Sequence, residues 1–417
     1  MSATFRSLRH HNYRLWAAGA LVSNIGTWMQ RTAQDWMVLT QLTHNDATSV
    51  GIVMSLQFGP QLLLMPIAGP TVDRVDRRTL LLITQSAMSV LAFVLGALVL
   101  SGSAALWHVY VLAFLLGCVT AFDAPARQTF VNDLVTSTDI ANAVALNSTS
   151  FHAARLVGPA AAGILIAKLG TGWAFLFNGA SFGAVLLSLA SLRTAELHPR
   201  SRPAESRGHA REGFRYVLAR PDLITALVMM FLVSTFGLNF AIFIPTMAVE
   251  AFHVGAAQFG SLASLMGIGA VAGGLFSARQ EHPRMGILLA GAAAFGITAA
   301  CAALAPNMLW FGCALVATGT AVQLYMTSTN SLIQTSTDPA MRGRVMAILL
   351  AVIMGCTPLG APIVGWIADT FGPRWALGVA AASGIAATFI GLRYRRKNSI
   401  QPPLPGPPPA PASGGTP

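Results

Sequence analysis

The stretch "GPTVDRVDRR", residues 69–78, places five charged side chains between two long apolar runs. Only 10% of the 417 residues are charged, whereas soluble proteins carry about 25%. The mean hydropathy of +0.60 is correspondingly high. The composition therefore indicates a membrane protein, in which a short charged segment marks a connection between two spans.

Twelve apolar stretches follow one another along the chain, each roughly the twenty residues that cross a bilayer as a helix. Their centres lie near Ile25, Gly59, Val90, Phe114, Arg155, Phe182, Thr235, Met266, Ala293, Val316, Met354 and Ile385. The polar N-terminus is not followed by a cleavage site, so the first span is not read as a removable signal. The sequence predicts an all-α membrane protein with twelve transmembrane helices.

The basic residues are distributed very unevenly between the two sides of this predicted topology. With twelve spans, 22 of the 26 basic residues fall on the side that holds both termini, and Lys168 and Arg374 fall on the other. Basic loops stay in the cytoplasm during insertion. The N- and C-termini are therefore predicted to be cytoplasmic. The arginine-rich composition suggests a bacterial inner membrane, and the scattered charge does not favour a nucleic-acid partner.

The two halves of the chain resemble each other. A shift of 202 residues matches Gly158 with Gly360, Gly163 with Gly365 and Gly170 with Gly372. Two pseudo-symmetric six-helix bundles are expected, with a solute path between them that opens to either side in turn. The predicted units are an N-terminal bundle (1–192), a cytoplasmic linker (193–221), a C-terminal bundle (222–396) and a disordered Pro-rich cytoplasmic tail (397–417).

The loop at residues 69–78 resembles the Gly-x-x-x-Asp-Arg-x-x-Arg-Arg signature of the major facilitator superfamily. In the fifth span, "ARLVGPAAAG" resembles the Gly-Pro motif of its antiporters, with Gly158, Pro159 and Gly163 matching. "APARQTFVNDLV" and "MRGRVMAI" are similar to the twelve-span proton antiporters that include enterobactin-type siderophore exporters and macrolide or multidrug exporters. The resemblance implies the major facilitator fold and proton-coupled export.

The resemblance also implies a conformational latch at the signature loop. Gly69 would allow close helix packing, and Asp73 would lie against the N-terminal end of the eleventh span, where free amide groups favour an anion. Asp123 is expected to pair with Arg127 four residues later, and with one of the loop arginines Arg74, Arg77 and Arg78. The alternative is that these basic residues only anchor the loop in the cytoplasm. Ala278 replaces the aspartate in the second half, so the latch is predicted to be one-sided.

Proton coupling requires an ionisable group inside the membrane. Asp35 is the main candidate, since Arg31 lies one turn away on the same helix face and can favour its charged form. The alternative is a static pair that does not titrate. Arg155 is the third candidate, with Asp35, an anionic substrate or carbonyl groups near Pro159 as possible partners. Glu250 and Asp369 lie at span ends and are interpreted as solvated.

The predicted substrate cavity is lined by polar and aromatic side chains in the first, seventh and tenth spans. The candidates are Trp28, Gln30, Gln34, Asn239, Gln323 and Tyr325. Amide and aromatic groups in an apolar cavity suit amphipathic molecules of drug or siderophore size. The alternative is that they pack within the bundles or against lipid.

The leading functional prediction is a monomeric secondary transporter that exports amphipathic small molecules by alternating access. The proton gradient would be its energy source, and no cofactor or metal is expected. An importer or facilitator of a polar metabolite and a non-transporting membrane sensor are the alternatives. Enzymatic activity is not expected, because the sequence has no nucleotide-binding loop, metal-ligand cluster or paired nucleophile and base.

Overall fold

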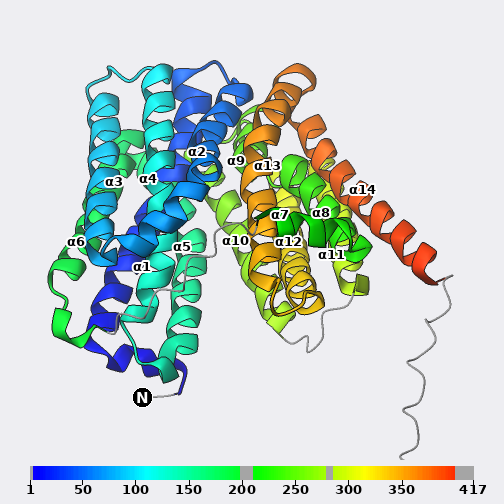
Figure 1. The fold of residues 1–417 in the computed structure, drawn as a ribbon. Coiled ribbons are helices and arrows are strands. Elements are labelled where there is room, and N and C mark those ends of the chain that lie inside the picture. The colour runs from blue at the N-terminus through cyan, green and yellow to red at the C-terminus, as the bar shows by residue number, and fades with distance from the viewer. Residues whose placement is uncertain (1–2, 198–209, 279–284, 400–417) are drawn as a thin grey trace, which may run out of the picture.

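The structure is a computed structural model in which residues 3–197, 210–278 and 285–399 are described. Over these ranges the chain is helical, without strands, and its two halves form neighbouring bundles (Figure 1). The first bundle contains α1 (His11–Met37), α2 (Ala47–Arg74), α3 (Arg77–Leu100), α4 (Leu106–Asp133), α5 (Ile140–Leu169) and α6 (Thr171–Ala190). The second contains α8 (Pro221–Leu232), α9 (Phe240–Thr246), α10 (Ala256–Ala278), α11 (Met285–Ala303), α12 (Met308–Ser336), α13 (Arg342–Phe371) and α14 (Pro373–Ser399).

The predicted spans are confirmed. By length and composition, eleven segments within the described ranges can cross a membrane, and one of them is the continuous stretch Pro221–Ala251 that includes α8 and α9. The twelfth long helix is α1, which is less apolar because it carries Gln30, Arg31, Gln34 and Asp35. All twelve predicted centres lie inside these segments, with Thr235 in the π-helical turn that follows α8. The seventh span is irregular, since π-helical turns at Val233–Gly237 and Met247–Ala251 flank α9.

The internal duplication is visible in the helix boundaries. α5 and α13 each contain 30 residues, and their bounds differ by the same 202 residues that align the two sequences. Each ends at a glycine with positive φ, 91° at Gly170 and 95° at Gly372. Only glycine adopts this conformation without steric cost, so the same chain reversal follows both helices.

The N-terminus and the last turn of α14 lie toward the same side of the molecule, at the bottom of Figure 1. We call this side the terminal face and the other side the opposite face. At the terminal face, Asp139 at the start of α5 binds the N-terminal residues Arg6, Arg9 and His10 at 2.6–2.7 Å. These three side chains therefore hold the N-terminal segment against the first bundle.

The two bundles meet along two seams in their opposite-face halves. In one, α2 packs against α13, and a Cβ atom on Gly365 would lie 2.5 Å from the carbonyl oxygen of Ala47. In the other, α5 packs against α10, and a Cβ on Gly163 would lie 2.7 Å from the carbonyl oxygen of Ala256. The two glycines are 202 residues apart, and each meets the first residue of its partner helix. Small residues of this kind let membrane helices approach closely.

A carboxylate from the second bundle holds the α2–α13 seam. Asp369, in the last turn of α13, accepts hydrogen bonds from the backbone amides of Ala47 at 2.7 Å and Thr48 at 2.9 Å, and from the Thr48 hydroxyl. These amides belong to the first turn of α2 and have no acceptor within that helix. Asp369 is therefore more than a solvated residue at a span end. We call this contact the Asp369 clamp.

A second carboxylate, that of Asp46, also binds the N-terminal end of α2. Asp46 is the N-cap of α2 and accepts from the amide of Ser49 at 3.2 Å. Burial raises the pKa of the Asp46 carboxyl, but hydrogen bonds from the Ser49 hydroxyl and from backbone amides of the first turn outweigh this effect and lower the pKa below its usual value. Two carboxylates thus share the positive end of one helix.

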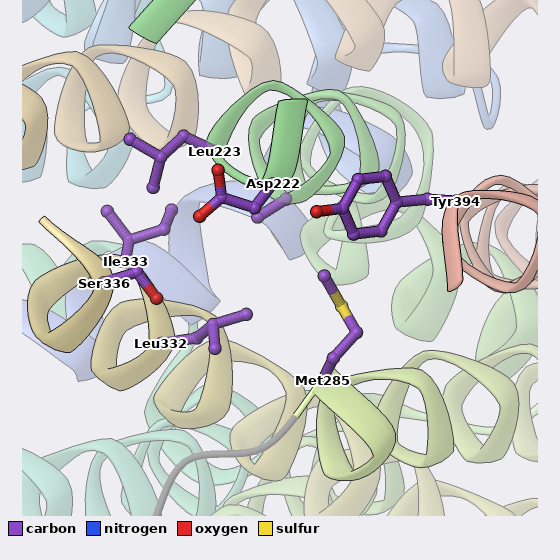
Figure 2. Close-up of a pocket in the computed structure, with 8 residues that line it drawn as sticks. Asp222, Leu223, Met285, Leu332, Ile333, Ser336 and Tyr394 are labelled. Atoms are coloured by element: carbon purple, nitrogen blue, oxygen red, sulfur yellow. The ribbon is translucent and has the colours of Figure 1, made fainter. Parts of the chain in front are cut away.

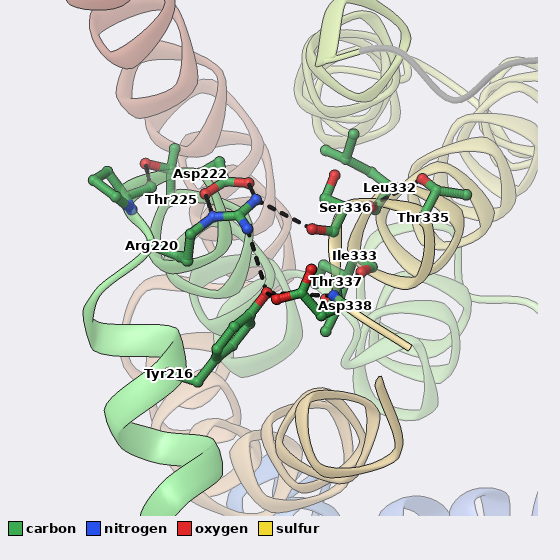
Figure 3. Close-up of polar contacts among 11 residues, drawn as sticks. Tyr216, Arg220, Asp222, Thr225, Leu332, Ile333, Thr335, Ser336, Thr337 and Asp338 are labelled. Atoms are coloured by element: carbon green, nitrogen blue, oxygen red, sulfur yellow. Dashed lines mark hydrogen bonds and ion pairs between the residues drawn. The ribbon is translucent and has the colours of Figure 1, made fainter. Parts of the chain in front are cut away.

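The linker includes a short amphipathic helix, α7 (Ala210–Leu218), that is docked on the second bundle. Glu212 pairs with Arg344 of α13 at 3.0 Å, and the Tyr216 hydroxyl donates to Asp338 at 3.0 Å. Figure 3 shows Tyr216 and Arg220 reaching the end of α12. Arg220 also binds Asp222 through two nitrogens, at 2.7 and 2.9 Å, and this raises the pKa of its guanidinium above the usual value. Residues 198–209 of the predicted linker and 400–417 of the predicted tail lie outside the described residues.

We expect Asp369→Ala to destabilise the protein by about 1–2 kcal/mol, because two first-turn amides of α2 lose a charged acceptor. The free energy of unfolding can be measured in lipid nanodiscs, together with the hydrogen-exchange rates of the Ala47 and Thr48 amides, which should rise. Asp73→Ala is the matched control, since Asp73 is exposed. Equal unfolding midpoints for the two variants would show that the clamp contributes nothing.

Candidate functional site

Three of the five charges of the signature loop, Asp76, Arg77 and Arg78, are each held by a different part of the first bundle. Asp76 is the N-cap of α3 and accepts from the amide of Thr79 at 2.8 Å. Arg77 donates to both carboxylate oxygens of Asp133 at 2.8 Å. Arg78 donates to the carbonyl of Leu189 in the last turn of α6 at 2.8 Å, where the helix dipole favours a cation. The loop is therefore bound to α4 and α6, beyond any role in topology.

Asp123 lies deeper in α4 than these arginines reach. It pairs with Arg127 at 3.1 Å, as predicted from the i,i+4 spacing, and accepts from Thr84 and Gln85 at 2.7 and 2.6 Å. The predicted pairing of Arg77 or Arg78 with Asp123 is not found. Asp133 is ten residues further along α4, roughly 15 Å along its axis, and is level with the start of α3. Arg74, the third loop arginine, has an interaction of its own.

Two of the residues proposed for the latch, Gly69 and Asp73, are not packed against the second bundle in this conformation. A Cβ atom on Gly69 would meet nothing within 4 Å, and Asp73 is exposed. Gly343, in the first turn of α13, is likewise exposed and would meet nothing within 4 Å. The helices α2 and α13 are thus in close contact at the opposite face, whereas Gly69, Asp73 and Gly343 at the terminal face do not take part in this contact.

Helix geometry relates these free positions to the packed ones. Gly51 packs on Ala361, and the Ser55 hydroxyl donates to the carbonyl of Pro358. Gly69 follows Gly51 by 18 residues, which is five helical turns, so it lies on the same face of α2. Because the two helices run antiparallel, extending this register places Gly69 opposite Gly343. Asp73 would then reach the first turn of α13.

Two of the three proton-coupling candidates, Arg31 and Arg155, lie around one aromatic ring. The guanidinium carbons of Arg31 and Arg155 lie 5.3 and 5.5 Å from the centre of the Trp28 ring. Phe58 of α2 lies 5.5 Å from Arg31, and the Phe151 ring packs edge-on against Trp28 at 5.7 Å. We call Trp28, Arg31 and Arg155 the arginine–tryptophan cluster. Its members come from α1 and α5, which the structure brings together.

Asp35 is near this cluster but is not in direct contact with its cations. Arg31 is close enough to Asp35 and to Arg155 for its charge to interact with both. Over the described ranges, however, no carboxylate oxygen lies within 4.0 Å of the Arg31 or Arg155 guanidinium, and Nε of Arg31 has no hydrogen-bond partner. The predicted static pair between Asp35 and Arg31 is therefore not formed in this conformation.

The Gly-Pro motif of α5 contains the glycines at which α5 packs closely against α1 and against α10. A Cβ on Gly158 would lie 2.5 Å from Cβ of Trp28, so this glycine sets the close approach of α5 to α1. Gly163, one turn beyond Pro159, meets α10 of the other bundle instead. The motif thus connects the arginine–tryptophan cluster with a seam between the bundles.

Most of the predicted cavity residues are enclosed within the bundles. Gln34, Asn239 and Tyr325 are buried, and Gln30 is buried where its oxygen accepts from Asn178 of α6 at 2.7 Å. Trp28 and Gln323 remain partly exposed. Gln323 donates to Thr327 at 3.2 Å. Amide side chains buried in a bundle need hydrogen-bond partners there, which is a packing role that the sequence cannot distinguish from substrate binding.

A small cavity lies at the terminal-face end of the second bundle (Figure 2). Its volume is about 180 Å³, and it is lined by Asp222, Met285, Leu332, Ser336 and Tyr394 among others. Drug-sized ligands occupy pockets of about 300–1,000 Å³. This cavity is too small for such a substrate. The described residues also contain no group of three His, Cys, Asp or Glu side chains arranged for a metal ion.

Sequence reasoning missed the Asp369 clamp and the Arg77–Asp133 pair. A signal for the clamp was available, because Gly365 and Asp369 repeat the Gly-x-x-x-Asp spacing of Gly69 and Asp73. Both pairs lie in the last turns of their helices, α13 and α2. No comparable signal marks Asp133, since its partner depends on how far α3 and α4 overlap.

The chain matches the family model described as transmembrane secretion effector over residues 2–401. It is 24% identical over 388 residues to the staphyloferrin A transporter of Staphylococcus aureus (strain NCTC 8325 / PS 47), a match that covers 90% of this chain and 94% of that protein. It is also 24% identical over 362 residues to the enterobactin exporter of Escherichia coli O1:K1 / APEC, covering 85% and 84%.

Solved structures share the fold. A bacterial homologue of the human lysosomal transporter Spinster, solved in an inward-facing and unoccupied conformation, has a TM-score of 0.74 at 15% identity and covers 97% of this chain and 100% of that one. A D-xylose–proton symporter has a TM-score of 0.70 at 12% identity, covering 92% and 97%. The chain belongs to the transmembrane secretion effector family of the major facilitator superfamily, and it is a multi-pass membrane transporter of small molecules and not an enzyme.

Proposed function

We propose that this transporter exports amphipathic small molecules of siderophore or drug type from the bacterial cytoplasm by alternating access, in exchange for protons. The observation that carries the proposal is the one-sided packing of the α2–α13 seam. The seam is closed at the Asp369 clamp, whereas Gly69 and Gly343 on the same helix faces are unpacked. A carrier needs a second arrangement in which these positions close and the clamp opens.

The charge distribution and the relatives support the proposed direction of transport. The topology predicted from the sequence places 22 of the 26 basic residues on the side of both termini, which favours a cytoplasmic location for that side. The present conformation would then be the one that is closed toward the outside of the cell. Two relatives that match most of the chain are named for siderophores, one as an enterobactin exporter and one as a staphyloferrin A transporter.

Asp35 is the proposed proton carrier. A charged carboxylate inside a membrane costs at least about 2.5 kcal/mol, and no ion pair within the described ranges holds Asp35 in its charged form. A proton can therefore neutralise it without breaking a salt bridge. Arg31, one turn away, favours the charged form when the two side chains approach. A change in their separation would release or capture the proton.

We expect Asp35→Asn to reduce gradient-driven efflux of enterobactin, staphyloferrin A or ethidium at least about tenfold, because the amide cannot carry a proton. Exchange of substrate across the membrane without a gradient should persist. The measurement is efflux from energised cells with and without an uncoupler, with Glu250→Gln as the matched control at a span end. Efflux that resists both the uncoupler and Asp35→Asn would refute proton exchange, and gradient-driven accumulation in cells would instead indicate import.

We expect cysteines at positions 69 and 343 to form a disulfide only when the terminal face closes. The Cβ atoms must approach to about 3.8 Å, and in this conformation Gly69 and Gly343 have no neighbour within 4 Å. The double variant is made in a background that lacks the four native cysteines, and cross-linking is scored with and without substrate and a proton gradient.

Ile67 paired with position 343 is the control, because residue 67 is turned about 200° from residue 69 on α2. Cross-linking of 69–343 that depends on substrate or gradient, with none for 67–343, is the expected result. If neither pair cross-links under any condition, the proposed second arrangement of the seam is wrong.

A further inference from the structure

The arginine–tryptophan cluster has more positive than negative charge. Arg31 and Arg155 are two cations, and Asp35 is the carboxylate whose charge interacts with Arg31. Ionised side chains within a membrane are costly and are normally paired or exposed to a water-filled path. One further negative charge would therefore balance the charge of the cluster.

The aromatic rings do not use the hydrogen-bonding capacity of the guanidinium groups. A cation–π contact places the flat guanidinium near a ring, as Trp28 and Phe58 do for Arg31. The N–H groups point outward in the guanidinium plane, where they match the oxygens of a planar anion. By contrast, the Arg127 guanidinium is already engaged by Asp123, Asn24 and Gln85. This contrast separates a structural arginine from one with free donors.

The structure argues against a purely local role for Arg155. Donation to carbonyl groups near Pro159 was one of the roles left open for Arg155, yet within the described ranges Arg155 makes no hydrogen bond. Arg31 and Arg155 are both partly exposed, as is Trp28. Part of each of these three side chains is therefore accessible at the surface of the structure.

The cluster also lies beside a seam between the bundles. Ser264 of α10 donates to the carbonyl of Leu156, the residue after Arg155, at 2.8 Å. Further along α1, the Trp36 ring stacks on Phe259 of α10 at 5.3 Å. A motion of one bundle against the other must therefore alter the surroundings of Arg155. This is the location that a substrate site of an alternating-access carrier requires.

We propose that Trp28, Arg31 and Arg155 bind the anionic group of the transported molecule, so that this carrier prefers amphipathic anions as substrates. The inference deepens the proposed export function and rests on it. A carboxylate, catecholate or hydroxamate oxygen pair would accept from Arg155 and Arg31, while Trp28, Phe58 and Phe151 would contact the apolar part beside it. Binding of one negative charge brings the cluster and Asp35 to neutrality.

Binding is measured with purified full-length protein in phosphatidylcholine nanodiscs, which contain no anionic lipid and no ion gradient. The probes are staphyloferrin A, its methyl ester and the cation ethidium. We expect Arg155→Gln to weaken staphyloferrin A binding about tenfold or more, since one charge-assisted hydrogen bond is lost. Ethidium binding should change less than about twofold. Arg155→Lys should recover part of the affinity, because the charge is kept and the planar donor pair is lost.

Arg374→Gln is the matched control, since Arg374 is an arginine at the opposite face that donates to the carbonyl of Ala303. It should bind all probes as wild type does. If Arg155→Gln does not fold, the wild-type protein still tests the proposal, because the acid must bind at least about tenfold more tightly than its uncharged ester. Equal affinity of acid and ester, or undiminished acid binding by folded Arg155→Gln, would overturn the anion site.

The binding assay also separates this inference from the transport proposal. Anion-selective binding without gradient-driven efflux would retain the site and refute proton-coupled export. Efflux of ethidium with no preference for anions in the binding assay would retain export and refute the site.

Discussion

The N-terminus of α2 is held by a carboxylate that belongs to the other half of the molecule. Its first-turn amides have no partner inside their own helix, and in a membrane such groups cannot be left unsatisfied. Asp369 supplies the acceptor from the last turn of α13, and glycines on both helices allow the approach that this contact needs. The bundles are thus joined at one end of their seam by a few directional contacts.

This arrangement has a counterpart at the other end of the same helix pair. Each helix carries a Gly-x-x-x-Asp segment in its last turns, and each begins where its partner ends. Only the Gly365–Asp369 segment is engaged in the present conformation, and Gly69–Asp73 is free of the seam. If the two segments were engaged alternately, closing the seam at one face would accompany its opening at the other face. The pseudo-symmetric α5–α10 seam has glycines at the equivalent positions, but Ala167 stands where α13 has Asp369.

How much of this could be predicted from the sequence depends on the range of each interaction. Span positions follow from hydropathy alone, and the equivalence of α5 and α13 follows from the repeated glycines. The Asp123–Arg127 pair was predicted because both residues lie on one helix. Arg77–Asp133 and the Asp369 clamp depend on how neighbouring helices overlap, which a sequence does not specify. The burial of Gln30 against Asn178 is a third case. The sequence alone does not distinguish a polar residue that lines a cavity from one that is buried between helices of a bundle.

The central claim is that the two bundles rock about the α2–α13 and α5–α10 seams. Pulsed electron paramagnetic resonance can measure it with two pairs of exposed label sites, Thr138 with Ala340 at the terminal face and Ser103 with Asn307 at the opposite face. On adding substrate and a proton gradient in proteoliposomes, the first distance should shorten while the second lengthens. Distances that stay fixed, or that change in the same direction, would contradict the account.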